Sequence, residues 1–241
     1  MMDLKQLCDG IWYLPHSQAT DRPALGYIRG EQDSLMVDCG NSPAHLAQFR
    51  RELDACGLSM PKTAVITHWH WDHTFAMCAF DGTTVACEAT ARQLRIMQDW
   101  EWTDTAMKER LRTGEDIEFC DTHIRLEYPD LSAIRVSTPK QVFDREITFD
   151  LGGLTCRAFR VGGPHSEDSV LVYIPERKVL FAGDGHTGDF YGLDGGYDRE
   201  KLAAYIDCLR SLDFETYIHG HVPPVSKADI LEELDTELAR L

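Results

Sequence analysis

The sequence predicts an α+β protein in which two β-sheets carry helices on their outer sides. Short apolar segments of strand length fall into two successive blocks along the chain, and each block is followed by segments with helical spacing. The chain has 241 residues, 43 % hydrophobic and 27 % charged, so it can bury a sizeable core as one large domain or two small ones. Two sheets covered by helices satisfy this pattern, although the pattern alone does not require them.

The first block opens with strands expected over 11–14, 25–29 and 34–38. Ser42 followed by Pro43 is typical of a helix start, because serine caps free backbone N–H groups and proline fits the first helical position. We expect this helix to run to about residue 57. Its buried stripe is expected to contain Leu46, Phe49, Leu53 and Cys56.

The middle of the chain continues with a short strand over 64–67, which leads directly into His68. A second short strand over 83–87 precedes a polar helical stretch from about 88 to 113. Residues 114–150 are the least regular part of the sequence, since they combine prolines with many charges.

The second block is expected to place strands over 147–149, 156–161, 170–174 and 179–182, then a helix over 199–212 and a strand at 217–218. Ser226 is predicted to cap the last helix. Asp229, three residues later, completes a carboxylate variant of the capping box.

The composition excludes several classes of protein. Asp and Glu number 40 against 24 Lys and Arg, which gives a net charge of −16 and disfavours binding to nucleic acid or to an anionic membrane. The longest apolar runs have strand length, far below the roughly 20 residues of a membrane span. The first ten residues lack an apolar signal region, and the eight cysteines are scattered without a CxxC pair, so we expect a cytoplasmic protein with mostly buried, reduced thiols.

The segment THWHWDH at 67–73 concentrates four metal-binding side chains within six residues, directly after an apolar strand. In an extended backbone His68 and His70 point to the same side, so both imidazoles can reach one ion. Asp72 and His73 fall where a helix is expected to begin, and they point toward a second ion. Imidazole and carboxylate ligands suit zinc, with iron and manganese as competitors. The alternative is a solvated histidine-rich loop.

This HxHxDH run resembles the signature of the metallo-β-lactamase superfamily. Three later segments resemble the places where members carry further ligands, namely Gly163–Ser166, Phe181–Asp184 and Gly220–His221. Two opening segments are similar to the family's first strands, namely Gly10–Leu14 and Val37–Gly40. The resemblance covers about residues 4–230. It implies a four-layer αββα sandwich of two mixed β-sheets with helices outside, with residues 1–241 as a single domain. Residues from about 95 to 145 match no family motif, and we expect them to form a lid or an interface.

The resemblance also implies a set of metal ligands. His68, His70 and His165 would hold one divalent ion. Asp72, His73 and His221 would hold the other, with Asp184 bridging the two. We therefore expect two divalent metal ions as cofactors, with zinc favoured and iron or manganese as alternatives.

Such a pair of cations gives a direct route to hydrolysis. Two adjacent cations can hold a water between them and lower its pKa from 15.7 to about 7, which yields a bridging hydroxide nucleophile. The same charges stabilise the oxyanion that develops on the substrate. Asp72 is the expected catalytic residue, because it can orient the hydroxide and pass its proton to the leaving group.

Departures from family patterns narrow the function. Asp184 stands where the commonest β-lactamase subclass has cysteine, and His70 stands where the redox diiron branch usually has glutamate. Nucleases of the family carry an added domain for which this chain has no evident room. We therefore predict hydrolysis of a small ester, lactone, thioester or phosphodiester. The alternative is a non-hydrolytic member, such as a redox diiron module or a metal-dependent sensor.

Other residues near the motifs are candidates for supporting roles. His186 and Tyr191 lie in the glycine-rich loop after Asp184 and are predicted to contact substrate. Asp38 is either a partner that fixes a ligand histidine or a turn residue at a strand end. His45 is expected at the surface, and His219 is not expected to bind metal.

The tryptophans form two pairs. Trp69 and Trp71 alternate with the ligands and are expected to form a wall that supports the metal loop. Trp100 and Trp102 lie among acidic residues, where core packing, a homodimer contact and a lid over the site are all open.

Overall fold

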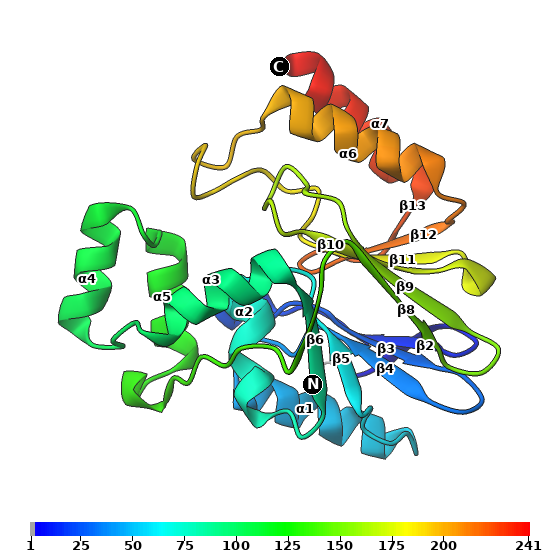
Figure 1. The fold of residues 1–241 in the computed structure, drawn as a ribbon, viewed down its shortest axis with the longest axis horizontal. Coiled ribbons are helices and arrows are strands. Elements are labelled where there is room, and N and C mark those ends of the chain that lie inside the picture. Colours follow the sequence, from blue (N-terminus) through cyan, green and yellow to red (C-terminus); the bar gives the residue numbers. More distant parts are fainter. Residues whose placement is uncertain (1–2) are drawn as a thin grey trace.

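The computed structural model describes residues 3–241, and within that range the strands form two sheets that lie face to face (Figure 1). Seven of these described strands form the first sheet, in sequence order from one edge to the other. They are β1 (Lys5–Cys8), β2 (Ile11–Leu14), β3 (Leu25–Arg29), β4 (Ser34–Val37), β5 (Thr63–Val65), β6 (Thr83–Cys87) and β7 (Gln141–Phe143). The pairs from β1 to β4 are antiparallel and those from β4 to β7 are parallel, so this sheet is mixed.

Six further strands of the described range form the second sheet, in the order β13-β12-β11-β10-β9-β8. They are β8 (Glu146–Asp150), β9 (Thr155–Arg160), β10 (Val170–Ile174), β11 (Val179–Gly183), β12 (Thr216–His219) and β13 (Val225–Ser226). The pairing of β11 with β12 is parallel, whereas the other pairs are antiparallel. Parallel pairing brings the ends of β11 and β12 to the same edge of the sheet.

Helices cover the outer faces of both sheets. In Figure 1, α1 lies against the first sheet, α6 and α7 lie over the second, and α3, α4 and α5 extend to one side. The helices are α1 (Pro43–Ala55), α2 (Trp71–Thr74), α3 (Glu88–Gln98), α4 (Asp104–Thr113), α5 (Glu118–Glu127), α6 (Arg199–Ser211) and α7 (Lys227–Arg240). Single 3₁₀ turns occur at η1 (Gln18–Thr20), η2 (Phe75–Ala79), η3 (Leu131–Ala133) and η4 (Pro175–Arg177).

Side chains that alternate between the two faces of each strand form three apolar layers, one between the sheets and one beneath the helices on each outer side. In β4, Leu35 and Val37 face the second sheet, whereas Met36 packs with the helices outside the first sheet. In β10, Val172 faces the first sheet and Leu171 packs under α6 and α7. Because successive side chains of a strand point to opposite faces, each strand supplies one layer between the sheets and one beneath the helices. The predicted αββα sandwich is confirmed.

Two local predictions differ from the structure. The helical stretch expected over 88–113 is two helices, because α3 ends at Gln98 and Thr103 caps α4 by accepting a hydrogen bond from the Ala106 N–H at 3.2 Å. The segment expected to be irregular contains α5, whose buried face holds Cys120 and Ile124. No side-chain cap marks the start of α5, so its sequence lacks the usual signal for a helix.

The eight cysteines are free in the structure. Four are buried (Cys39, Cys87, Cys120 and Cys156), Cys8 and Cys208 are half-buried, and Cys56 and Cys78 are exposed, so half of the thiols rather than most are buried. The buried position predicted for Cys56 is wrong, because α1 ends at Ala55, one residue earlier. Among residues 3–241, no helix has both the length and the apolar character needed to cross a membrane.

Candidate metal centre

The histidine-rich segment follows β5 at the edge of the first sheet. Asp38, which follows β4, holds the start of this segment, because its carboxylate accepts hydrogen bonds from the backbone N–H of Thr67 at 2.7 Å and from the Thr67 hydroxyl at 2.8 Å. Helix α2 then begins at Trp71, one residue after His70. The change from extended backbone to helix separates the first two histidines from Asp72 and His73.

The structure brings His68, His70 and His165 together, with one ring nitrogen from each within 4.8 Å of the others. His165 Nε2 lies 2.9 Å from His70 Nδ1. The other nitrogen of His165, Nδ1, lies 3.0 Å from the carbonyl oxygen of Gly188 and is placed to donate to it. This contact leaves the Nε2 atom of His165 free to act as a ligand.

A second group contains Asp72, His73, Asp184 and His221, with ligand atoms that also lie within 4.8 Å of one another. Asp72 Oδ2 is 3.0 Å from both His73 Nε2 and His221 Nε2. Asp184 Oδ2 is 3.1 Å from His221 Nε2. Four side chains from three separate segments therefore converge on one point.

Asp184 links the two groups. It follows β11, and its Oδ2 atom lies 3.9 Å from His165 Nε2 as well as 3.1 Å from His221 Nε2. Gly220 makes this position possible, because a Cβ atom there would overlap Asp184 Oδ1 and lie 3.0 Å from the His73 ring. All seven residues predicted as ligands are thus placed in two adjacent clusters.

The donor atoms fit divalent cations. His68 Nε2, His73 Nε2 and Asp184 Oδ1 are buried without a hydrogen-bond partner. Leaving such a buried polar atom unpaired costs about 1–3 kcal/mol, so the arrangement needs a further partner at these atoms. Imidazole and carboxylate donors in a compact group are the ligand set that zinc, iron and manganese accept.

Burial and nearby charge set the protonation of these histidines. Burial lowers the pKa of His68 and of His70 well below the usual value, so both rings are neutral, which is the form that binds metal. Burial also acts to lower the pKa of His73, but the surrounding carboxylates, led by Asp72 and Asp38, outweigh it and raise that pKa well above the usual value. The carboxylates of the second group therefore favour positive charge at this position.

A cavity of about 720 Å³ opens above the two clusters. The loop after β11 forms one side with Phe190 and Tyr191, and the start of α5 forms the other with Ile117 and Phe119. His186 also lines the cavity, and its Nδ1 atom lies 3.1 Å from the Tyr217 hydroxyl. Both predicted substrate contacts, His186 and Tyr191, therefore face the space next to the clusters.

Tyr191 joins the two sides of the cavity. Its ring centroid lies 5.2 Å from that of His70 and 5.0 Å from that of Trp69. Its hydroxyl donates to Asp116 Oδ1 at 3.3 Å, in the turn before α5. Burial raises the pKa of Asp116 to about 6. The loop after β11 is thus tied to the helical segment across the site.

Several supporting predictions have clear outcomes. Asp38 contacts His73, which favours the first of its two interpretations. Trp71 packs away from the clusters against Phe75, as a supporting wall would, whereas Trp69 lies beside His70 with ring centroids 4.5 Å apart. His219 belongs to neither cluster, and its Nδ1 accepts a hydrogen bond from the backbone N–H of His221 at 3.0 Å.

The surface position predicted for His45 is wrong. Its side chain is only 1 % exposed, because helix α1 turns the ring inward against Gly40, where a Cβ atom would collide with it. Burial lowers the pKa of His45 to about 3, so the ring is neutral.

The lid interpretation of Trp100 and Trp102 is also wrong. Neither residue lines the cavity over the clusters; both pack against the outer core of the first sheet. The guanidinium of Arg110 lies between them, 4.5 Å from the ring of Trp100 and 4.8 Å from that of Trp102. Within residues 95–145 it is α5, not the tryptophan pair, that reaches the site.

One site neighbour has no signal in the sequence. Asp21 follows η1 and lies 3.4 Å from His221 Nδ1, on the side away from Asp72. Burial, with help from Asp72, raises the pKa of Asp21 to about 7. No motif surrounds this residue, so only the tertiary structure identifies it.

Sequence comparison supplies independent findings. Residues 24–221 match the model of a family described as the metallo-beta-lactamase superfamily. Acyl-coenzyme A thioesterase MBLAC2 from Homo sapiens is 23 % identical over 199 residues, and the protein of that name from Gallus gallus is 25 % identical over 194 residues. Each match covers 75 % of this chain but only 64 % of the relative, so it spans less than two thirds of those proteins.

Solved structures share the fold. A metallo-beta-lactamase from Pontibacter korlensis superposes with a TM-score of 0.71 at 18 % identity, and the match covers 100 % of both chains. A metallo-beta-lactamase family protein from Thermus thermophilus gives a TM-score of 0.68 at 19 % identity, over 98 % of this chain and 81 % of the other. At these identities the likeness concerns the fold alone.

Proposed function

The chain belongs to the metallo-β-lactamase superfamily, and we propose that it is a metal-dependent hydrolase that cleaves small thioesters and related esters. The observation that carries the proposal is the pair of adjacent ligand clusters at the base of one open cavity. The named function of the thioesterase relatives supports the substrate class.

The proposed ligand set divides as the clusters do. His68, His70 and His165 would hold one ion, and Asp72, His73 and His221 would hold the other, with Asp184 shared between them. When bound, two such cations, for which we favour zinc, supply Lewis acidity to a carbonyl oxygen and bring the pKa of water close to neutrality. The buried atoms without partners at His68, His73 and Asp184 support this assignment.

The chain's own residues would then manage protons and orientation. The carboxylate of Asp72 lines the cavity, and we assign to it the proton that the attacking water loses. Attack forms a bond between the water oxygen and the carbonyl carbon, and the bond from that carbon to sulfur breaks. Transfer of the proton from Asp72 to the leaving sulfur completes a reaction that yields one carboxylic acid and one thiol.

Other residues would hold the substrate in place. His186 lines the cavity, and the Tyr217 hydroxyl fixes its ring by contact with Nδ1, which leaves Nε2 to face the substrate. Tyr191 packs beside His70, with ring centroids 5.2 Å apart, and would keep water from that edge of the site. A net charge of −16 disfavours long polyanions, which supports a small-molecule substrate over a nucleic acid.

A substrate panel tests the proposal. The metal-loaded protein is assayed on thioesters, lactones, a cephalosporin and bis-p-nitrophenyl phosphate, in parallel with His70→Ala and Asp184→Ala. We expect thioester or ester hydrolysis that falls by at least about 100-fold in both variants, while circular dichroism shows an intact fold. Hydrolysis that both variants retain in full would refute the assignment of the site.

A further inference from the structure

The cavity wall beyond the metal clusters combines apolar and acidic side chains, and this combination narrows the substrate. Resting on the proposed function, we infer that the protein prefers uncharged acyl thioesters or esters whose apolar acyl group lies against Phe119 and Phe190. Acyl groups carried on a polyanionic thiol such as coenzyme A are then poorer substrates.

Three large apolar side chains on the cavity wall are exposed to solvent. Phe119 is 54 % exposed, Phe190 is 46 % exposed and Val222 is 40 % exposed, and all three line the same cavity. Large apolar side chains that stay in water around one opening indicate a binding surface, because covering them with an apolar group is favourable.

The apolar wall also begins next to the proposed reaction centre. The ring of Phe190 lies 6.3 Å from that of His165, measured between centroids. Phe119, at the start of α5, lines the same cavity. We place the acyl chain of a substrate whose carbonyl lies at the clusters against these two rings.

The cavity wall outside the metal clusters carries a carboxylate and no cationic lysine or arginine. Glu233 lines the cavity, and among the described residues that do so there is neither lysine nor arginine. Arg22 follows Asp21 in sequence, but its guanidinium is used by Glu127 at 2.7 Å and by Gln48 at 2.8 Å. Proteins bind phosphate groups through such cationic side chains, so the phosphates of coenzyme A would meet a carboxylate here instead.

The first experiment compares two substrates with the same acyl group. Octanoyl N-acetylcysteamine thioester has an uncharged leaving group, whereas octanoyl-coenzyme A carries phosphates. We expect kcat/KM of the metal-loaded protein to be at least about tenfold higher for the uncharged thioester. Equal or higher kcat/KM for octanoyl-coenzyme A would overturn the inference. Absence of hydrolysis of both thioesters would instead refute the proposed function.

The second experiment tests the acyl wall. Phe119→Ser and Phe190→Ser change exposed side chains, so both variants should fold. We expect each to lower the ratio of kcat/KM for the octanoyl thioester to kcat/KM for the acetyl thioester by about tenfold, because the longer acyl group covers more of the apolar wall. Leu193→Ser is the matched control, because Leu193 is also 46 % exposed in the same loop but does not line the cavity. Loss of activity on both thioesters, or an equal effect of the control, would contradict the placement of the acyl group.

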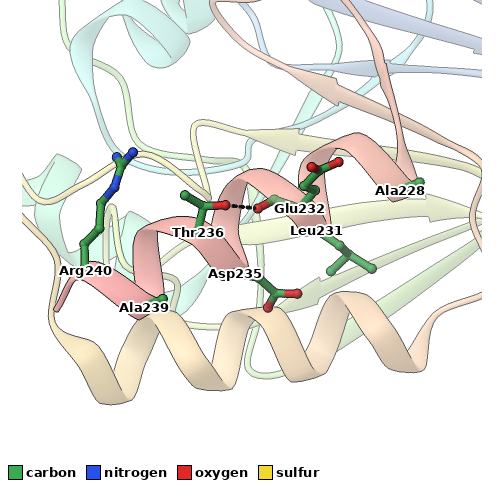
Figure 2. Close-up of a pocket in the computed structure, with 7 residues that line it drawn as sticks. All are labelled: Ala228, Leu231, Glu232, Asp235, Thr236, Ala239 and Arg240. Atoms are coloured by element: carbon green, nitrogen blue, oxygen red, sulfur yellow. Dashed lines mark hydrogen bonds between the residues drawn. The ribbon is translucent and has the colours of Figure 1, made fainter.

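The third experiment reverses the charge at the rim. Glu233→Lys should raise the ratio of kcat/KM for octanoyl-coenzyme A to kcat/KM for the uncharged octanoyl thioester by about tenfold. The control is Glu232→Lys, which makes the same charge change on the same helix. Glu232 lines a separate depression on the surface of α7 with Ala228 and Asp235, as Figure 2 shows. An increase of the same size in both variants would mean that net charge, not the cavity wall, controls selection.

Discussion

The Nδ1 atom of His73 lies 2.8 Å from Oδ2 of Asp38, a residue 35 positions earlier in the chain. The same carboxylate accepts hydrogen bonds from the backbone N–H and the hydroxyl of Thr67. Asp38 therefore fixes both the entry to the histidine-rich segment and the ring orientation that directs His73 Nε2 toward Asp72. A partner of this kind sets the tautomer of a ligand histidine.

Asp38→Asn should weaken metal binding without unfolding the protein. The amide can still accept from Thr67, but its NH₂ group would face His73 Nδ1 and favour the opposite tautomer. We expect affinity for zinc to fall by about 10- to 100-fold, measured by competition with a chromogenic chelator. Unchanged affinity would mean that Asp38 serves only as a turn residue.

Asp116→Asn should stabilise the protein at neutral pH. The folded-state pKa of Asp116 is raised by burial from 3.8 to about 6, so the folded state holds the proton more tightly than the unfolded state. Stability is therefore lost as pH rises from about 4 to 6, and a neutral amide avoids this loss. The free energy of unfolding should rise by at most about 3 kcal/mol at pH 7.5 and by close to zero at pH 3.5. Urea unfolding at both pH values measures it, and a gain of equal size at pH 3.5 would contradict the role of burial.

His45→Leu should make the protein more resistant to acid. Burial lowers the folded-state pKa of His45 from 6.5 to about 3, so the unfolded state binds the proton more tightly. Stability is then present above pH 6.5 and decreases as the pH falls toward 3. Between pH 7 and pH 4, the wild type should lose about 3 kcal/mol more of its free energy of unfolding than His45→Leu does. A difference that does not change with pH would show that the ring is not held neutral.

Arg110→Met should reduce stability but not hydrolysis. The guanidinium lies between the rings of Trp100 and Trp102, and its Nη1 donates to the backbone carbonyl of Glu101 at 3.0 Å. Loss of these contacts should cost about 1–3 kcal/mol of unfolding free energy, since each cation–π contact contributes up to about 2 kcal/mol when desolvated. Thermal unfolding and kcat/KM are measured together. A large fall in kcat/KM with little loss of stability would restore the lid interpretation of the tryptophan pair.

The sequence predicted the fold and the members of both clusters because their signals are local. The ligands of the HxHxDH run are adjacent in sequence, and the alternation within strands such as β4 and β10 follows directly from residue type. Resemblance to the superfamily then located His165, Asp184 and His221 in later segments. Their metal-binding roles, like the organisation of residues 1–241 as a single domain, stay predictions.

The parts that sequence reasoning missed depend on tertiary contacts. Asp21 and His221 are 200 positions apart in sequence and meet only in the folded chain. His45 lies in the first turn of an amphipathic helix, where position alone favours neither the buried nor the exposed face. Helix α5 lacks a side-chain cap, so its contribution to the cavity was hidden in a segment rich in charges.

The most direct test of the account is a metal titration of the ion-free protein that follows bound zinc and thioester hydrolysis in the same samples. We expect no hydrolysis without metal, and a rise in activity that ends at about two ions per chain. We also expect His70→Ala and His221→Ala each to lower the bound metal toward one ion per chain. Hydrolysis that persists at full rate after exhaustive chelation, or a protein that binds no divalent metal, would contradict it.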